Sequence, residues 1–317
     1  MVEFFQMVWD GLILPLARLI FYVSLGLAFA NFVESLNWTH RIARLSRPLI
    51  RLGHLSSATG ASFSMAFFSG VSANSMLAEA YDQQQIDKKE LICANLFNSL
   101  PTYFLHLPTM FFITAPLIKG AAFIYVAITF LAAVLRTLII LVVGHYLLEK
   151  KKYERPALAT DERVSLRQAL GKTWQRFRKR LKKIVFLTVP IYTVIFVINK
   201  SGGFAWLEGF MAAHLSILSW LHPQSLGIIV LHLAAEFTAG LAVAGALLDA
   251  GTMNYREIVL ALLVGNILSS PVRAVRHQFP YYAGIFSPRI ALELIIYNQS
   301  FRVGSLVVVS LVYYLFF

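Results

Sequence analysis

The chain has 317 residues, of which 58% are hydrophobic and 14% charged, and its mean hydropathy is +0.66. A soluble domain is about half apolar and about a quarter charged, so this composition argues against a soluble protein and indicates a polytopic membrane protein. The single cysteine, Cys93, excludes an internal disulfide and a metal site built on several cysteines.

The net charge of +12 does not indicate nucleic acid binding, because most of the excess lies in one stretch. Residues 149–183 hold 13 lysines and arginines against four acidic residues, and they lie between hydrophobic segments. The positive-inside rule places this basic linker in the cytoplasm, where it would contact anionic lipids. We therefore expect a multi-pass protein of the cell inner (cytoplasmic) membrane with both termini extracytoplasmic.

The linker separates two stretches, 1–148 and 184–317, that contain the same elements in the same order. Each begins with an apolar helix, continues with an amphipathic segment and a stretch rich in small residues, and ends with two long helices. In chain order, these predicted elements are 11–34, 37–54, 56–81, 88–117 and 119–148, then 184–199, 203–222, 224–250, 255–281 and 288–316.

Two local similarities support an internal duplication. The segment KKELICANLFNSLP is similar to NYREIVLALLVGNILSSP, which aligns Glu90 with Glu257. The segment LRTLIILVVGHYLL is similar to FRVGSLVVVSLVYYLFF, which aligns Arg136 with Arg302. The two copies are therefore about 166 residues apart.

The two amphipathic segments carry opposite charge signals. The segment 37–54 places arginines at three- to four-residue spacing, as in a helix that lies in the headgroup region. The segment 203–222 has no lysine or arginine and instead carries Trp206 and Trp220. The positive-inside rule then places these segments on opposite faces of the membrane, so we expect the two copies to be inverted.

The stretch 56–81 must enter and leave the membrane on one side, because the chain already crosses twice between this stretch and the cytoplasmic linker. Its seven serines and two glycines favour tight packing and a turn. We therefore predict an all-α polytopic membrane protein of two inverted repeats. Each repeat would have three membrane-crossing helices, an interfacial amphipathic helix and a re-entrant helical hairpin, as in many secondary transporters.

One long helix in each copy contains a proline that follows asparagine and serine. Proline removes a backbone donor and frees the carbonyl four residues earlier, which would be Phe97 before Pro101 and Ile267 before Pro271. The neighbouring polar side chains could satisfy the freed backbone, contact a solute, or only accompany a packing kink. The candidate substrate-binding residues at these breaks are Asn98, Ser99, Thr102, Asn266, Ser269 and Ser270.

The pattern of a Ser/Gly-rich hairpin, a basic residue before glutamate, an apolar run and an Asn-to-Pro break occurs twice and resembles the nucleoside-recognition or Gate domain. The resemblance covers 56–148 and 224–317. Gate domains occur in concentrative nucleoside transporters, ferrous-iron permeases and spore-maturation membrane proteins. The resemblance implies a core of hairpins facing broken helices. The chain lacks the G-x-x-x-x-G-K-[ST] motif of a GTP-binding domain.

Arginines within the predicted membrane helices are the remaining candidates for a site. Arg136 and Arg302 occupy equivalent positions near mid-membrane, where an arginine is costly and usually functional. They could bind an anionic substrate or cap carbonyls at the hairpin tips. Arg273 follows Pro271 and could join them, or could be an end charge.

The hairpin stretches contribute three further candidates. Glu236 and His232 lie four residues apart on one helical face and could carry a coupling proton, or the glutamate could pair with a membrane arginine. Asn74 in the first stretch could contact the substrate or serve only in packing.

The sequence favours a secondary transporter or flippase that moves a small polar solute or lipid headgroup, anionic or phosphate-bearing, by alternating access. The alternatives are a nucleoside transporter and a non-transporting assembly component of the spore-maturation type. No catalytic or metal-binding motif is recognisable, so we expect neither an enzyme nor a cofactor. The sequence leaves a homo-oligomer open.

Overall fold

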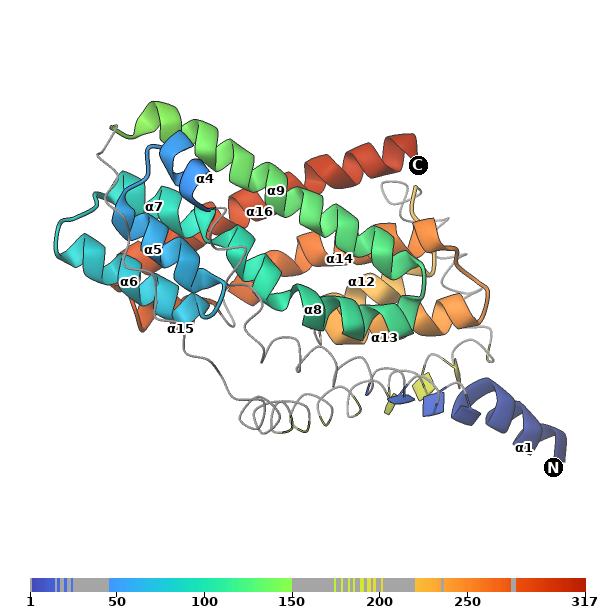
Figure 1. Ribbon diagram of the computed structural model, residues 1–317. Helices are drawn as coiled ribbons and strands as arrows, with labels where there is room; N and C mark the ends of the chain where they lie inside the picture. Colours follow the sequence, from blue (N-terminus) through green and yellow to red (C-terminus); the bar gives the residue numbers. More distant parts are fainter. Residues whose placement is uncertain are drawn as a thin grey trace.

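The computed structural model describes residues 2–14, 46–149, 220–234, 237–274 and 278–317, with isolated positions from 16 to 24 and from 174 to 201. Every regular element in these ranges is a helix (Figure 1). Three helices are long and apolar enough to cross a membrane, which confirms the predicted helical class. They are α9 (Ala121–Leu147), α14 (Tyr255–Arg273) and α16 (Pro288–Phe316).

Several predicted elements lie largely outside the described residues. These are the apolar helices 11–34 and 184–199, the amphipathic segments 37–54 and 203–222, and the basic linker. Near the N-terminus, α1 (Val2–Val8) continues as a π-helix, η1 (Trp9–Ile13). The end of the first amphipathic segment is a short helix, α4 (Ser46–Leu52).

The stretches rich in small residues form helical hairpins. The first consists of α5 (Ser57–Ala66) and α6 (Gly70–Asp82), and the second of α12 (Ser225–Ala234) and α13 (Phe237–Asp249). In the first hairpin each helix begins at a serine whose side chain accepts a hydrogen bond from a backbone N–H of the first turn. This cap satisfies one of the donors that a helix start leaves without an internal partner.

The first Asn-to-Pro segment is broken at Asn98, which separates α7 (Lys88–Phe97) from α8 (Ser99–Ile118). Pro101 is the third residue of α8, where a missing N–H breaks no helical hydrogen bond. In the second segment, α14 instead runs through Pro271 to Arg273, and α15 (Phe279–Ala283) follows. The helix predicted for 255–281 therefore corresponds to α14 and α15, and residues 275–277 between them lie outside the described residues.

Two helix ends recur at one spacing along the chain. Gln84 and Gly251 follow α6 and α13, and both adopt a left-handed backbone, with φ of 57° and 68°. Asp87 and Asn254 cap α7 and α14 by accepting from a backbone N–H three residues on. Each pair is 167 positions apart (251 − 84 and 254 − 87), within one position of the spacing that aligns Arg136 with Arg302.

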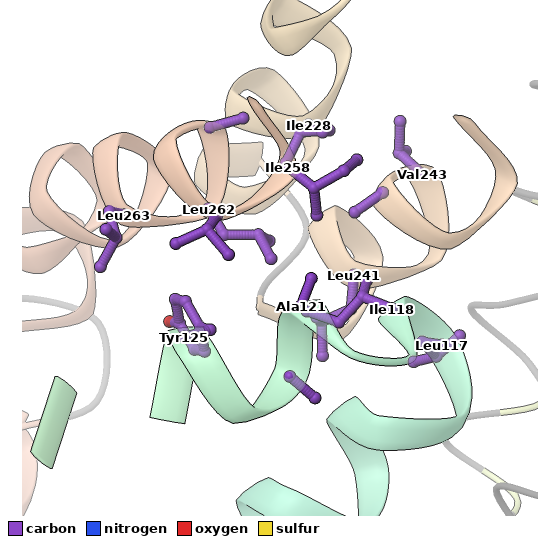
Figure 2. Close-up of a cluster of buried hydrophobic side chains, with 14 of the residues drawn as sticks. Leu117, Ile118, Ala121, Tyr125, Ile228, Leu241, Val243, Ile258, Leu262 and Leu263 are labelled. Atoms are coloured by element: carbon purple, nitrogen blue, oxygen red, sulfur yellow. The ribbon is translucent and has the colours of Figure 1, made fainter. Parts of the chain in front are cut away.

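The two halves of the chain pack closely against each other. Helix α9 crosses and contacts α16, and α13 lies against α8 (Figure 1). The main apolar cluster joins Leu117, Ile118 and Tyr125 of the first half to Leu241 and Leu262 of the second (Figure 2). Lipid tails are as apolar as these side chains, so such contacts stabilise a membrane protein by close packing.

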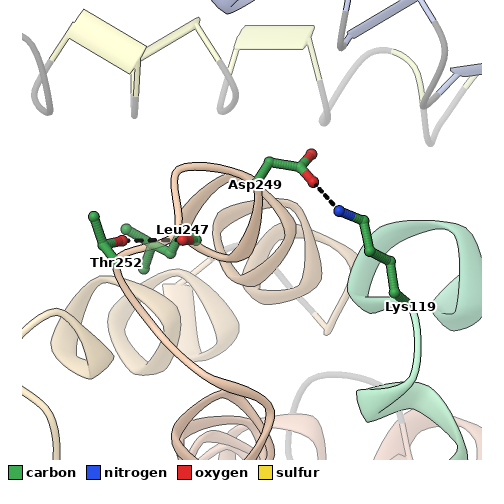
Figure 3. A network of polar contacts seen from close by, with 4 residues as sticks. All are labelled: Lys119, Leu247, Asp249 and Thr252. Atoms are coloured by element: carbon green, nitrogen blue, oxygen red, sulfur yellow. Dashed lines mark hydrogen bonds and ion pairs between the residues drawn. The ribbon is translucent and has the colours of Figure 1, made fainter.

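Small residues and an ion pair bring α13 and α8 together. A Cβ atom added to Gly245 would lie 2.9 Å from the carbonyl oxygen of Leu117, so the two backbones approach closely at this point. Beside this contact, Lys119 Nζ forms an ion pair with Asp249 at 2.7 Å (Figure 3). The next turn of chain is held by Thr252, whose hydroxyl donates to the Leu247 carbonyl.

Candidate functional site

A cavity of about 350 Å³ lies between the break at Asn98 and helices α6, α9, α14 and α16. Both polar and apolar side chains line it. Seven of them are residues singled out from the sequence, namely Asn74, Asn98, Ser99, Thr102, Arg136, Asn266 and Arg302. The two halves of the chain therefore contribute to one site.

Each membrane arginine bonds to a residue of an Asn-to-Pro segment. Arg136 of α9 is only 8% exposed, and its Nε donates to Ser99 Oγ at 3.0 Å. Arg302 of α16 donates through Nη2 to Asn266 Oδ1, at a longer 3.4 Å. The alternative that they cap hairpin carbonyls finds no support in the hydrogen bonds of the described residues.

The positive charge at the cavity has no carboxylate partner among the described residues. The ion pairs found in these ranges join Lys88 to Glu293, Lys119 to Asp249, and Arg289 to Glu293. The buried carboxylate of Glu90 accepts hydrogen bonds at the start of the first hairpin, from the Ser56 N–H and the Thr59 hydroxyl.

Amide and phenol groups form a second polar cluster in the same cavity, which we call the amide cluster. Asn95 is its centre, and its Nδ2 donates to Asn74 Oδ1 at 3.0 Å and to Tyr282 Oη at 3.1 Å. Asn298 Nδ2 donates to Asn95 Oδ1 at 3.5 Å. All four residues line the cavity. Asn74 thus both packs the first hairpin against α7 and faces the cavity.

Three predicted residues support the site without lining the cavity. Ser269 and Ser270 donate their hydroxyls to the Asn266 carbonyl. Arg273 donates to the same carbonyl and, at 2.6 Å, to Asn266 Oδ1. The sequence left open whether such side chains satisfy the backbone near Ile267, contact a solute or accompany a packing kink. In the structure all three bond to the Asn266 carbonyl, and Arg273 also holds the Asn266 side-chain oxygen.

His232 of the proposed coupling pair does not line the cavity. His232 is 2% exposed and packs against Gly265, where an added Cβ would lie 2.7 Å from the ring Nδ1. Glu236 lies outside the described residues.

At the first break, the side chains of two predicted residues are held by local bonds. Asn98 Nδ2 donates to Ser62 Oγ of the first hairpin at 2.7 Å. The Thr102 hydroxyl donates to the Asn98 carbonyl at 2.8 Å. The break is therefore tied to the hairpin, and its polar atoms remain beside the cavity.

Comparison with known proteins gives relatives but no function. The chain is similar to uncharacterized proteins of Methanocaldococcus jannaschii. One is 25% identical over 271 residues, which cover 85% of this chain and 84% of that protein. Another is 24% identical over 311 residues, which cover 96% of this chain and 99% of that protein. No family model and no solved structure matches the chain.

Several lining residues were missed by the sequence analysis, and helical spacing could have found two of them. Asn298 precedes Arg302 by four residues on α16, and Thr129 precedes Arg136 by seven on α9. Residues at these spacings share one helical face. Tyr103, His106, Gln278 and Tyr282 also line the cavity, but their positions depend on how the halves pack.

Proposed function

We propose that this chain is a membrane transporter that binds a small anionic or phosphate-bearing solute in the cavity. The observation that carries the proposal is the pair Arg136 and Arg302, which face one cavity with no carboxylate partner among the described residues. Guanidinium groups bind phosphate and carboxylate through paired N–H donors. A bound anion would supply the negative charge that no described side chain supplies beside Arg136 and Arg302.

We also propose the architecture that would move such a solute, two inverted repeats whose hairpins are re-entrant. The recurrence of helix ends at 167 positions supports the repeat. The hairpin of each half packs against helices of the other half: α13 against α8, and residues of α6 against α15 and α16. Non-helical backbone at membrane depth needs a cavity or buried surroundings, and transporters place their substrates at such breaks.

Membership of the Gate-domain group is part of the same proposal, as is an inner-membrane location with the basic linker in the cytoplasm. A hairpin paired with a broken helix in each half is the arrangement that the resemblance implies. The charge of the linker supports its orientation, because positively charged loops are retained in the cytoplasm.

A second candidate function is transport of an uncharged nucleoside, and the amide cluster favours it. Asparagine and tyrosine side chains both donate and accept, as recognition of neutral polar groups requires. Arg136 and Arg302 weigh against it, because a neutral solute would leave both charges without a counterion. A non-transporting assembly component is a third candidate. The cavity of about 350 Å³ disfavours it, because a protein without a solute needs no such space.

Counterflow in proteoliposomes separates these candidates. Vesicles carrying the purified protein would be loaded with unlabelled orthophosphate, glycerol 3-phosphate or uridine and then given the labelled compound outside. We expect accumulation of a phosphate compound, and its loss with Arg136→Gln. Accumulation of uridine that survives Arg136→Gln would favour the nucleoside candidate. No accumulation of any of the three would contradict the proposed transport of a phosphate compound.

Arg256→Gln is the matched control for this experiment. Arg256 is on α14 like the cavity residue Asn266, but its side chain donates to the Tyr314 carbonyl and stacks near that ring, outside the cavity. Its replacement removes one positive charge of the same type from the same membrane protein. We expect counterflow to remain at the wild-type level.

A further inference from the structure

We propose that the solute has two different parts, an anionic group held by Arg136 and Arg302 and a neutral, hydroxyl-bearing group held by the amide cluster. This inference rests on the proposed function and specifies the chemistry of its substrate. It is carried by two kinds of group in one cavity lining: two guanidinium groups, which only donate hydrogen bonds, and the amide cluster, whose side chains both donate and accept.

The region around the arginines is built for an anion. A guanidinium has five N–H donors and no acceptor. Arg136 uses Nε for Ser99, and Arg302 makes one long bond to Asn266. Most donors of both groups therefore remain for a ligand, because no other hydrogen bond of either is found within the described residues.

The amide cluster is built for a neutral polar group. Asn95, Asn74, Asn298 and Tyr282 supply amide N–H groups, amide oxygens and a phenol hydroxyl. Alcohol groups match this set, since each hydroxyl both donates and accepts. A second anionic group here would meet amide oxygens, and no lysine or arginine other than Arg136 and Arg302 is found in the described lining.

Helix geometry sets the distance between the two regions. Asn298 and Arg302 lie four residues apart on α16, which corresponds to about 6 Å along the helix axis. Across the first break, Asn95 and Ser99 repeat this separation of four positions, and Ser99 is the residue that holds Arg136. The anionic group and the nearest hydroxyl of the solute are therefore expected about one helical turn apart.

The size of the cavity agrees with a small two-part solute. At about 350 Å³, it lies near the lower end of the ~300–1,000 Å³ typical of small-molecule sites. Orthophosphate alone would leave the amide cluster without a ligand. A phosphorylated sugar or polyol has an anion and hydroxyls at the required separation. The same chemistry occurs in a free solute and in a hydroxylated phospholipid headgroup.

Calorimetry with three soluble probes tests the inference on the unmodified protein. Orthophosphate presents only the anion, ribose only the hydroxyls, and ribose 5-phosphate both. We expect ribose 5-phosphate to bind about tenfold more tightly than orthophosphate, as two or three added hydrogen bonds would give. Equal affinities of the two phosphates would overturn the inference while leaving the anion site intact. Binding of neither would overturn the proposed function as well.

A variant then assigns the gain to the amide cluster. Asn298→Leu replaces the amide with an apolar side chain of similar size. The affinity for ribose 5-phosphate should fall to within about threefold of the affinity for orthophosphate, and the affinity for orthophosphate should not change. An equal loss for both phosphates would contradict a separate hydroxyl region. If Asn298→Leu does not fold, Asn298→Ser tests the same residue, and the comparison on the unmodified protein still decides the inference.

Competition with lipids tests whether the two-part ligand is a free solute or a lipid headgroup. In nanodiscs, phosphatidylglycerol carries a phosphate and glycerol hydroxyls, whereas phosphatidic acid lacks the hydroxyls. Displacement of ribose 5-phosphate by phosphatidylglycerol and not by phosphatidic acid would identify a lipid headgroup as the two-part ligand. Failure of both lipids to displace it would identify a free solute. Equal displacement by both lipids would contradict a role for hydroxyls.

Discussion

Arg136 on α9 donates through Nε to the hydroxyl of Ser99, the first residue of α8, over 3.0 Å. The bond connects a long continuous helix to the first Asn-to-Pro break and uses the donor of the guanidinium nearest its stem. No hydrogen bond of the two terminal nitrogens is found within the described residues, so they remain for a ligand. Ser99 is therefore expected to orient the arginine rather than to neutralise it.

Replacement of Ser99 by alanine tests this orienting role. We expect Ser99→Ala to weaken orthophosphate binding by about three- to tenfold, because one neutral-to-charged hydrogen bond that fixes the guanidinium is lost. Thr137→Ala is the matched control, since its hydroxyl also makes a buried hydrogen bond, to the Ala133 carbonyl on α9, but Thr137 does not line the cavity. Calorimetry would measure both, and equal losses would contradict a specific role for Ser99.

The contact between α13 and α8 predicts a strong effect at one glycine. Gly245→Ala should lower the free energy of unfolding by about 1–3 kcal/mol, because the new methyl group meets the Leu117 carbonyl oxygen at 2.9 Å. Gly227→Ala in the same hairpin meets only Val243 Cγ1 at 3.6 Å. It should be neutral or slightly stabilising. Unfolding in detergent would compare them, and equal stability of the two variants would contradict the close packing.

The aligned glutamates should differ in importance. Glu90→Ala should destabilise the fold by about 3 kcal/mol, because it leaves the buried Ser56 N–H and Thr59 hydroxyl without their acceptor. Glu257→Ala breaks an exposed capping box with Asn254 and should cost only about 1 kcal/mol. The same unfolding assay measures both variants. A larger loss for Glu257→Ala would contradict the structural role of Glu90.

Labelling of introduced cysteines tests the proposed inversion of the two halves. Gln83 and Ala250 are exposed, follow α6 and α13, and are 167 positions apart (250 − 83). In a Cys93→Ala background, Gln83→Cys and Ala250→Cys should react with an impermeant maleimide from opposite sides of sealed vesicles. Reaction from the same side would rule out inverted repeats. Unmodified Cys93 is the control, because it is 3% exposed and should not react.

Composition and periodicity were sufficient for the helical class and for the ends of the long helices. Helix starts are local features that a proline or a capping side chain indicates in the sequence. Examples are Pro288 at the start of α16 and the N-caps Asp87 and Asn254. The helix predicted for 255–281 includes Pro271, and α14 likewise runs through this proline to Arg273. A proline inside a membrane helix can be tolerated when neighbouring side chains bond to the backbone, as Ser269, Ser270 and Arg273 do.

The site could be predicted only where a residue type is costly in a membrane. The sequence singles out Arg136, Arg302 and Asn98 because a polar side chain inside a membrane helix is costly and usually has a function. Tyr282 gives no such signal, because tyrosine is common near membrane surfaces. Its place beside Asn95, 187 residues earlier in the chain, follows from the packing of α7 against α15 and α16. His232 shows the reverse case, since an ionisable side chain is buried away from the cavity.

The central claim, that two arginines hold an anion in this cavity, is tested most directly by calorimetric titration of orthophosphate into the wild-type protein and Arg302→Gln. We expect Arg302→Gln to weaken binding by about 10- to 150-fold, the equivalent of about 1.5–3 kcal/mol for a charged hydrogen bond, with an unchanged unfolding temperature. Arg302→Lys should recover part of the loss. Wild-type affinity for orthophosphate in Arg302→Gln would contradict the account.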